Sequence, residues 1–343
     1  MQDHSYSKNS HFQRAAAGVV NEKLNELITK KFDVDKLSLE SNRVVRIADM
    51  GCAAGPNTFL AMENLVRTIR ANCLREAPEF HVFFNDLPSN DFNALFAALP
   101  SDNNRGYFAA GVAGSFHRRL FPDLYLHFVY TSTALHRLSM APEEVSRTGS
   151  PAWNKGRVHY TSAGKEVVKA YSNQFGKDFG DFLQAREKEV VSGGMVTIIM
   201  PGIPNGMPHR KVPSGLMFHL MDECLADMVK EGLIPEKDVD NFNLPVYTPS
   251  PEEMTTAVTQ NGEFTIEAME LTNPSPTPAG PIDVRMWTMH VRVAMDAILR
   301  EDFTADTIDE LFERLCMKLS AATEELDSTY KDGIQLFIVL RRK

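Results

Sequence analysis

The residues with the clearest chemical meaning lie at positions 44–58, where an apolar run ends in a turn rich in glycine. The apolar part is typical of a buried strand, and Asp49 stands where that strand would end. Gly51 and Gly55 lie four residues apart, so the turn lacks the G-x-G-x-x-G spacing of dinucleotide dehydrogenases. Pro56 suits the first turn of a following helix. This order favours a nucleotide-like ligand at the end of a sheet, although an ordinary strand–turn–helix unit also uses glycine.

Two further groups follow predicted strands and could bind other parts of such a ligand. Asp86 ends the apolar run 80–85, and an acid at the carboxyl end of a sheet strand can accept hydrogen bonds from a ribose diol. The alternative role of Asp86 is to cap the next turn. Ser115 and Phe116 follow the third predicted strand, where the ring could stack on adenine and the hydroxyl could hydrogen-bond to it. A buried core aromatic is the alternative for Phe116.

Strands and helices must alternate to bring these groups to one edge of a sheet. A first helix is predicted from Asn9 and Ser10 through Leu27, with its apolar residues on one face. Strands are then predicted at 44–49, 80–85, 107–112, 124–130 and 195–200, and helices at 58–70, 92–99 and 165–190. This alternation predicts an α/β fold with a mostly parallel sheet and helices on both faces.

The pattern changes after Pro201, where several prolines and glycines indicate a loop up to position 213. Beyond it, helices are predicted at 216–231, 251–260, 282–300 and 306–326, and strands at 264–271 and 334–340. We therefore predict a Rossmann-like core with an inserted α-helical cap. The predicted core takes residues 1–205 and 261–343, with segment 1–30 closing over the substrate, and the predicted cap takes residues 206–260 and part of 280–325.

Composition narrows the possible functions. The chain has 343 residues, of which 43% are hydrophobic and 24% charged, as expected of a globular protein with a sizeable core. A net charge of −9 without a basic stretch argues against nucleic acid binding. No apolar run approaches about 18 residues and the N-terminus lacks signal-peptide character, so no membrane partner is expected. Four scattered cysteines fit no zinc motif and favour a reducing, cytoplasmic setting.

A series of short motifs runs in order across nearly the whole chain. The motifs are Ser5-Tyr6-Ser7-Lys8-Asn9-Ser10 with Gln13, Ala48-Asp49-Met50-Gly51-Cys52, Gly55-Pro56-Asn57-Thr58, Phe84-Asn85-Asp86-Leu87-Pro88, Asn90-Asp91-Phe92-Asn93, Gly114-Ser115-Phe116, Leu135-His136, Asn154-Lys155-Gly156 and Asp240-Asn241-Phe242-Asn243-Leu244-Pro245. This ordered set resembles the plant SABATH family of carboxyl and N-methyltransferases, enzymes that use S-adenosylmethionine (SAM). Within the family, stretches 80–86, 108–116, 157–161 and 169–186 look most similar to the branch of loganic acid (iridoid) carboxyl methyltransferases.

The resemblance implies SAM as methyl donor, a small-molecule acid as acceptor and a homodimer. A carboxylate is already ionised near neutral pH, so methyl transfer needs positioning and exclusion of water rather than a general base. The resemblance places Tyr6, Asp49, Cys52 and Asn57 around the methionine part of SAM, with Gly51 and Ser132 also at the cofactor, Asp86 and Leu87 at the ribose and adenine edge, and Ser115 and Phe116 at adenine.

The same resemblance implies residues on the acceptor side. Gln13 and His136 would face the acceptor. Phe218 and Met221 lie on the inner face of predicted helix 216–231 and could line the pocket, with packing in the cap as the alternative. Some family members hold a magnesium ion, and oxygen ligands suit Mg²⁺. The matching positions are Asn154, Asp240, Asn243 and the Phe242 carbonyl, with loop capping as the alternative for Asp240 and Asn243.

Two residues depart from the family pattern at the acceptor site. Thr133 stands where the family has tyrosine, and Arg137 where it has tryptophan. A reshaped pocket is one interpretation, in which Thr133 opens space and Arg137 binds a carboxylate bidentately. In the other, Arg137 turns outward and Gln13 and His136 position the substrate. We therefore expect a carboxyl methyltransferase with an altered pocket, and keep two alternatives: N-methylation of a heterocycle or alkaloid, and a SAM-binding protein that has lost methyl transfer.

Overall fold

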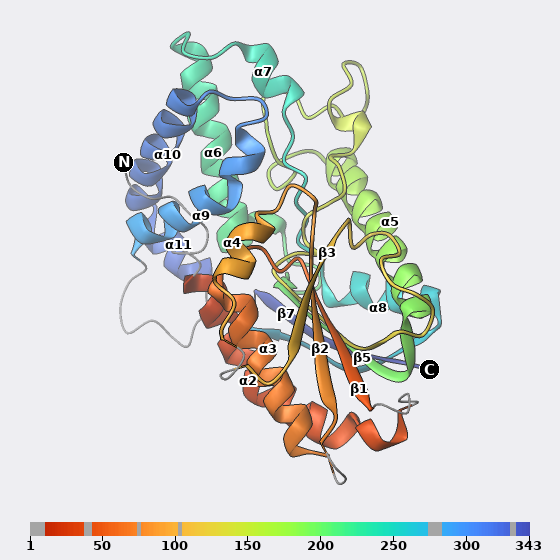
Figure 1. Ribbon diagram of the computed structural model, residues 1–343. Coiled ribbons are helices and arrows are strands. Elements are labelled where there is room, and N and C mark those ends of the chain that lie inside the picture. Colours follow the sequence, from red (N-terminus) through yellow and green to blue (C-terminus); the bar gives the residue numbers. More distant parts are fainter. Residues whose placement is uncertain (1–10, 38–42, 74–76, 102–104, 274–282, 330–333) are drawn as a thin grey trace.

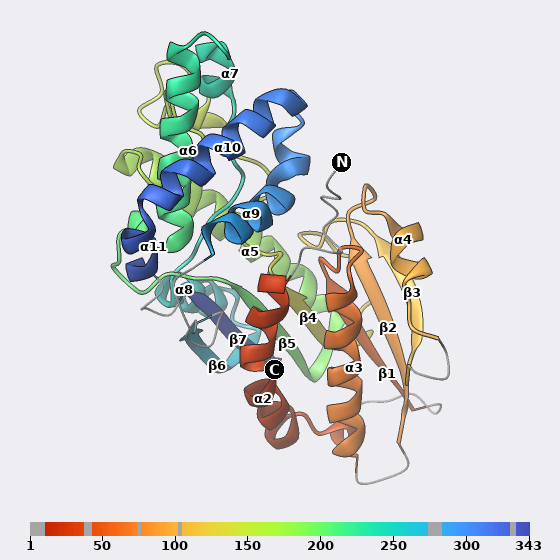
Figure 2. The same ribbon diagram turned by 90° about the vertical axis from the view of Figure 1, so that its left-hand side faces the viewer.

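The centre of the fold is a seven-stranded sheet with helices on both faces (Figures 1 and 2). The computed structural model describes residues 11–37, 43–73, 77–101, 105–273, 283–329 and 334–343. The strand order is β3-β2-β1-β4-β5-β7-β6. The first five strands are parallel, which confirms the predicted α/β class. The strands are β1 (Val44–Met50), β2 (Glu79–Asp86), β3 (Phe108–Ala113), β4 (Leu126–Ser132), β5 (Val190–Pro201), β6 (Phe264–Thr272) and β7 (Gln335–Arg342).

The C-terminal strand β7 lies inside the sheet, between β5 and β6. It is antiparallel to both neighbours, with Ile338 opposite Ile198 on one side and Met269 on the other. Residues 335–340 are all buried, which fits a strand with partners at both edges and cover on both faces. The edge of the sheet on this side is therefore β6.

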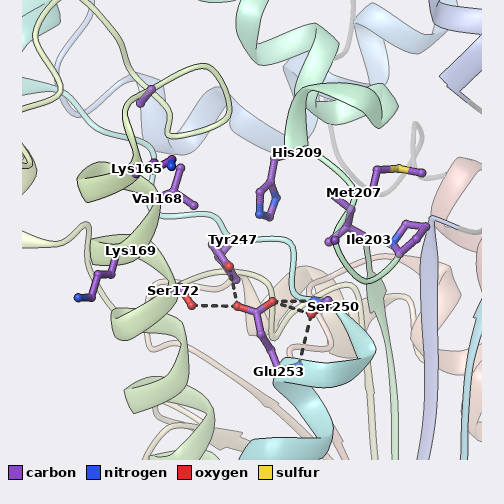
Figure 3. Close-up of a pocket in the computed structure, with 13 residues that line it drawn as sticks. Lys165, Val168, Lys169, Ser172, Ile203, Met207, His209, Tyr247, Ser250 and Glu253 are labelled. Atoms are coloured by element: carbon purple, nitrogen blue, oxygen red, sulfur yellow. Dashed lines mark hydrogen bonds between the residues drawn. The ribbon is translucent and has the colours of Figure 1, made fainter.

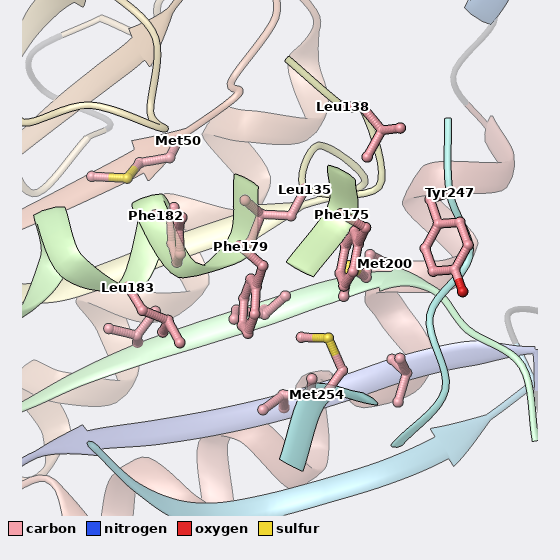
Figure 4. Packing of buried hydrophobic residues seen from close by; sticks show 14 of the residues in the cluster. Met50, Leu135, Leu138, Phe175, Phe179, Phe182, Leu183, Met200, Tyr247 and Met254 are labelled. Carbon is pink, nitrogen blue, oxygen red and sulfur yellow. The ribbon is translucent and has the colours of Figure 1, made fainter. Parts of the chain in front are cut away.

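Side chains of β1 alternate between the two faces of the sheet, as the period of a strand requires. Ile47 packs with the helices α2 (His11–Lys31), α3 (Pro56–Ala71) and α4 (Phe92–Ala97). Ala48 and Met50 pack with α5 (Lys165–Glu189) and α8 (Pro251–Asn261). Figure 4 shows this second cluster, in which Phe175, Phe179 and Phe182 of α5 lie against the sheet.

Helix α3 starts at the glycine turn, with Pro56 in its first turn and Gly55 as its N-cap residue. Its buried residues recur at helical spacing and fix α3 on the sheet beside β1 and β2. They are Thr58, Phe59, Met62, Leu65, Val66 and Ile69. The predicted strand–turn–helix unit is therefore present, and the N-terminus of α3 lies directly after the turn.

A separate helical layer has a core of its own, as Figures 1 and 2 show. It contains α6 (Pro213–Lys230), α7 (Glu236–Asn241), α9 (Val284–Leu299), α10 (Ala305–Ala321) and α11 (Thr323–Thr329). The short α7 was not predicted, and the single helix predicted at 306–326 is broken after Ala321. Helix α8 instead packs against α5 and β6. The limits assigned to core and cap stay a prediction. No helix in the described part of the chain could cross a membrane.

Candidate active site

The turn after β1 packs directly against the turn after β4. Gly51 has a φ of 80°, and its backbone N–H donates to the carbonyl of Asn85 over 2.9 Å. A Cβ added to Gly51 would overlap the Cβ of Ala134 and approach the ring of Phe116 to 3.6 Å. Glycine is therefore required here both for its backbone angle and for the close approach. The Gly51 turn therefore contacts the end of β2 at Asn85, the segment after β3 at Phe116 and the segment after β4 at Ala134.

Asp86 holds the glycine turn from the neighbouring strand. Its Oδ2 accepts a hydrogen bond from the backbone N–H of Ala53 over 2.7 Å, and its Oδ1 accepts one from the N–H of Leu87 over 2.8 Å. Ala53 has a φ of 53°, unusual for a residue with a side chain, and Asn90 donates to its carbonyl over 3.2 Å. A non-glycine residue kept in this conformation by two neighbours is typical of a functional turn. Both carboxylate oxygens of Asp86 already cap backbone groups, so a ribose would share them.

Asp49 is buried at the end of β1. Burial raises its pKa to about 7, a hydrogen bond donated by the Thr58 hydroxyl acts in the opposite direction, and the charge of Asp86 raises the pKa further. Burial likewise raises the pKa of the Cys52 thiol, so this side chain stays protonated. A buried acid without a cation beside it is unfavourable in its charged form, and a positively charged ligand would restore its ionised state.

Asn85 ties the third predicted binding segment to the same turn. Its side chain is completely buried, and its Nδ2 donates to the carbonyls of Val112 over 2.8 Å and Gly114 over 2.9 Å. The N–H of Gly114 donates to the Asp86 carbonyl over 2.8 Å. The segment with Ser115 and Phe116 therefore lies at the same end of the sheet as Asp86.

The other residues predicted to bind the cofactor lie on several different elements, and one of them lies outside the described residues. Phe116 is half-buried and packs edge-to-face on Phe182 at a centroid distance of 6.4 Å. Asn57 lies in the first turn of α3, and Leu87 is 49% exposed. Ser132 ends β4 and is half-buried. Tyr6 lies outside the described residues.

The predicted acceptor segment follows β4. Thr133 has a φ of 56°, a strained angle for a β-branched residue, and its N–H donates to the Ile199 carbonyl over 2.7 Å. His136 is half-buried. Burial of its ring, followed by the charge of Arg137, lowers its pKa to about 3. His136 is therefore neutral, and among the described residues its Nδ1 has no hydrogen-bond partner. Gln13 lies in α2, and its side chain is outside what the structure describes.

Arg137 turns toward the helical layer. The residue is exposed, and its Nη2 donates to the backbone carbonyl of Ala294 in α9 over 2.7 Å. This geometry agrees with the outward interpretation and differs from a guanidinium directed at an acceptor carboxylate. Phe218 and Met221 of α6 are buried in the core of the helical layer, a place that agrees with packing in the cap, and their part in an acceptor pocket stays a prediction. Phe218 stacks on His159 at a centroid distance of 3.8 Å.

The predicted metal positions lie where segment 154–156 contacts the end of α7 and the residues directly after it. Asn154 Nδ2 donates to Asn243 Oδ1 over 2.8 Å, and Asp240 Oδ1 accepts from the Gly156 N–H over 2.7 Å. Asn154 Oδ1 is buried and has no partner among the described residues, so it could serve a cation. The described residues contain no group of three acidic, histidine or cysteine side chains that could hold a metal. The oxygens present fit Mg²⁺ in kind, with Asp240 as the one carboxylate.

A cavity of about 490 Å³ lies between α5, the segment before α6 and the start of α8 (Figure 3). Glu253 accepts hydrogen bonds there from Ser172 over 2.9 Å, Tyr247 over 2.7 Å and Ser250 over 2.9 Å. The N–H of Tyr247 also donates to the His136 carbonyl over 2.8 Å, so one wall of the cavity adjoins the acceptor segment. None of the lining residues is a predicted cofactor or acceptor residue.

Comparison with known proteins decides the family. A family model described as SAM dependent carboxyl methyltransferase matches residues 1–343. The chain belongs to this family. It is 43% identical to loganic acid O-methyltransferase of Catharanthus roseus over 99% of this chain and 92% of that protein. It is 36% identical to farnesoic acid carboxyl-O-methyltransferase of Arabidopsis thaliana over 98% and 96% of the two chains. A solved structure of loganic acid methyltransferase with SAH matches with a TM-score of 0.95, 42% identity and coverage of 100% and 98%.

Family membership confirms several predictions. The protein is a SAM-dependent methyltransferase, and the SABATH resemblance is correct. The β1–α3 turn fits SAM in kind, because no cation of the described residues contributes to the pKa of the buried Asp49, and the ammonium and sulfonium groups of SAM would supply one. The role of each individual residue stays a prediction.

Two residues of this site stand in the motifs quoted from the sequence, but no role was predicted for either of them. Thr58 donates to Asp49, and Asn85 joins β2 to the segment after β3. Asn85 carried a usable signal, because an amide at the end of the apolar run 80–85 needs partners if it is buried. Thr58 carried none, since a hydroxyl in the first turn of a helix is common.

Proposed function

We propose that this chain transfers a methyl group from SAM to the carboxylate of a plant small-molecule acid of terpenoid or iridoid type. The pocket would be altered at Thr133 and Arg137. The proposal is supported by relatives named for loganic, farnesoic and gibberellic acids. The observation that carries it is a short segment in which Ala134 packs on Gly51, between the strained Thr133 and the half-buried, neutral His136.

The chemistry assigned to the chain is positioning. SAM, when bound, supplies an electrophilic methyl group on its sulfonium. The acceptor carboxylate is ionised without help, so the residues need to strip water from it and align it. A neutral His136 fits this task, because it can form a hydrogen bond to the acceptor without fixing the carboxylate in a strong ion pair. Asp49 and Asp86 would bind the methionine and ribose parts of SAM.

The departures from the family pattern would set the acceptor. Threonine is smaller than tyrosine, so Thr133 leaves room beside the acceptor. Arg137 is engaged at Ala294, which keeps its charge at the helical layer and away from the nucleophile. We therefore expect an acid with a bulkier skeleton than those accepted where tyrosine and tryptophan stand.

A methyl-transfer screen tests the proposal. Labelled SAM is offered with a panel of plant carboxylic acids that includes iridoid acids, beside xanthines and alkaloid amines. Label in an ester supports the proposal. Label on nitrogen alone would establish the N-methylating alternative. No transfer, with SAM binding intact, would favour loss of methyl transfer. The double variant T133Y/R137W is screened in parallel with the wild type. If only the double variant forms an ester, the loss of methyl transfer is due to Thr133 and Arg137.

The assembly, location and metal of the protein are also part of this proposal. A homodimer in the cytoplasm fits the family resemblance, and the four cysteines are free thiols. Light scattering coupled to size-exclusion chromatography measures the assembly, and a mass of one chain would contradict the homodimer.

Mg²⁺ at Asn154, Asp240 and Asn243 would be structural. A rise in melting temperature with Mg²⁺ that Asp240→Asn abolishes would support the metal, and an unchanged melting temperature would oppose it.

A further inference from the structure

Arg186 and Glu189 form an ion pair at the C-terminal end of α5 that is completely buried. Both side chains are 0% exposed. Arg186 Nε lies 2.8 Å and Nη2 lies 2.7 Å from Glu189 Oε2. The two residues are three apart on the helix, so the pair forms within one turn.

The other N–H groups of Arg186 reach the predicted cofactor segments. Its Nη1 donates to the carbonyl of Phe116 over 2.8 Å and to the sulfur of Met50 over 3.1 Å. Its Nη2 donates to the carbonyl of Arg118 over 3.0 Å. Met50 directly precedes the Gly51 turn, so a single guanidinium contacts both the end of β1 and the segment that begins at Phe116. All five N–H groups of the guanidinium thus have a partner.

Glu189 binds the other end of the segment that begins at Phe116. Its Oε1 accepts hydrogen bonds from the backbone N–H groups of Leu120 and Phe121, the latter over 2.9 Å. The ion pair therefore binds carbonyls at the start of segment 116–121 and N–H groups at its end. The guanidinium also lies 5.0 Å from the ring of Phe182, on which the Phe116 ring packs. Figure 4 shows Phe182 and Met50 within the same apolar cluster.

We propose that Arg186 and Glu189 are positioning residues for the adenine part of SAM. They fix the backbone and the ring of Phe116 relative to the end of β1. The inference rests on the proposed assignment of Ser115 and Phe116 to adenine. A buried ion pair often adds little stability over an apolar pair of similar volume. We therefore assign to this pair the role of fixing the position of segment 116–121. Lysine could not replace Arg186, because a single ammonium cannot reach Glu189 and both carbonyls at once.

Binding of two ligands to matched variants tests the pair. The ligands are SAH and adenosine, which lacks the methionine part, measured by titration calorimetry. Arg186→Lys keeps the positive charge and loses the several N–H donors of the guanidinium. Glu189→Gln keeps the shape of the side chain and loses its negative charge. We expect each variant to raise the Kd of both ligands by the same factor, about tenfold, because the shared loss lies at the adenine end. Glu189→Gln keeps the test available if Arg186→Lys does not fold.

Two controls separate the possible failures. Phe175→Leu lies in the same helix and core cluster but seven residues before Phe182, and we expect it to lower the melting temperature without changing the Kd of adenosine. Phe116→Leu reports on the adenine site itself. Adenosine binding that Phe116→Leu weakens and Arg186→Lys leaves unchanged would overturn the positioning role alone. Binding that neither variant weakens would overturn the adenine assignment and the positioning role with it.

Discussion

The guanidinium of Arg137 donates a hydrogen bond of 2.7 Å to the backbone carbonyl of Ala294, 157 residues further along the chain. Arg137 belongs to the acceptor segment after β4, and Ala294 lies within α9 of the helical layer. This contact links the sheet to the layer of helices at the carboxyl end of the strands. At the position where the family pattern has tryptophan, this chain therefore has an arginine that contacts the helical layer, and its role toward the acceptor stays a prediction.

Arg137→Ala should loosen this link and leave SAM binding unchanged. The lost hydrogen bond is partly exposed, so we expect a loss of about 1 kcal/mol or less in the free energy of unfolding. The KM for the acceptor should rise, because α9 is no longer fixed to the acceptor segment. Arg300→Ala is the matched control, since it removes an exposed arginine directly after α9 whose ion pair among the described residues is with Asp296, four residues earlier. A raised Kd for SAM in Arg137→Ala would contradict the interpretation.

The affinity for SAM should increase with pH up to about 7. In the free protein, burial raises the pKa of Asp49 to about 7, and a bound cation favours its ionised form. Binding therefore releases a proton below pH 7, and the affinity rises by up to about tenfold per pH unit in that range. Calorimetric titration with SAM between pH 5.5 and 7.5, in buffers of different ionisation enthalpy, measures both the affinity and the number of protons released on binding. An affinity independent of pH would exclude this role for Asp49.

Asp49→Asn should stabilise the ligand-free protein at high pH. The folded-state pKa of about 7 lies above the ordinary value of 3.8. A group with a raised pKa favours folding at low pH, and this contribution is lost as the pH rises to 7. The variant keeps an acceptor for the Thr58 hydroxyl and avoids the buried charge. We expect its melting temperature to exceed that of the wild type at pH 8 by more than at pH 5. The opposite order would show that Asp49 is ionised by some other partner.

Gly51→Ala should abolish SAM binding and destabilise the fold. The new Cβ would overlap Ala134 at a φ of 80° and push apart the turns after β1 and β4. The expected loss in the free energy of unfolding is about 2 kcal/mol. Gly149→Ala is the control, because Gly149 has a φ of 84° and open space around it, so it reports backbone strain alone. If both variants lost the same stability and Gly51→Ala bound SAM normally, the close approach at Ala134 would be irrelevant.

The sequence predicted the local units well because their signals are local. The β1–α3 turn could be predicted from an apolar run, Gly51 and Pro56, all within one short stretch. The break between α10 and α11 was missed because residues 306–326 are apolar at helical spacing throughout. The place of β7 inside the sheet was not predictable either, since a buried run gives no partner.

Long-range pairings explain the rest of what the sequence left undetermined. Arg186 looked like one of many charged residues in a long helix, and only the fold brings Phe116 and Met50 to it. The direction of Arg137 depends on α9, which lies far along the chain. Charged side chains carry no periodic signal of their partners, so such contacts follow from tertiary structure alone.

Thr133→Gly should stabilise the fold and impair methyl transfer. Thr133 has a φ of 56°, which a β-branched residue adopts only under strain, and glycine relieves that strain by about 1 kcal/mol. Thr133→Ala is the comparison, because alanine keeps a Cβ at the same angle. Glycine is ordinarily the less stable of the two, so a higher melting temperature for Thr133→Gly would reverse the usual order. We expect this reversal together with a lower kcat, since a flexible residue before His136 no longer holds the acceptor segment in place. A lower melting temperature for Thr133→Gly than for Thr133→Ala would show that the backbone at this position stores no strain.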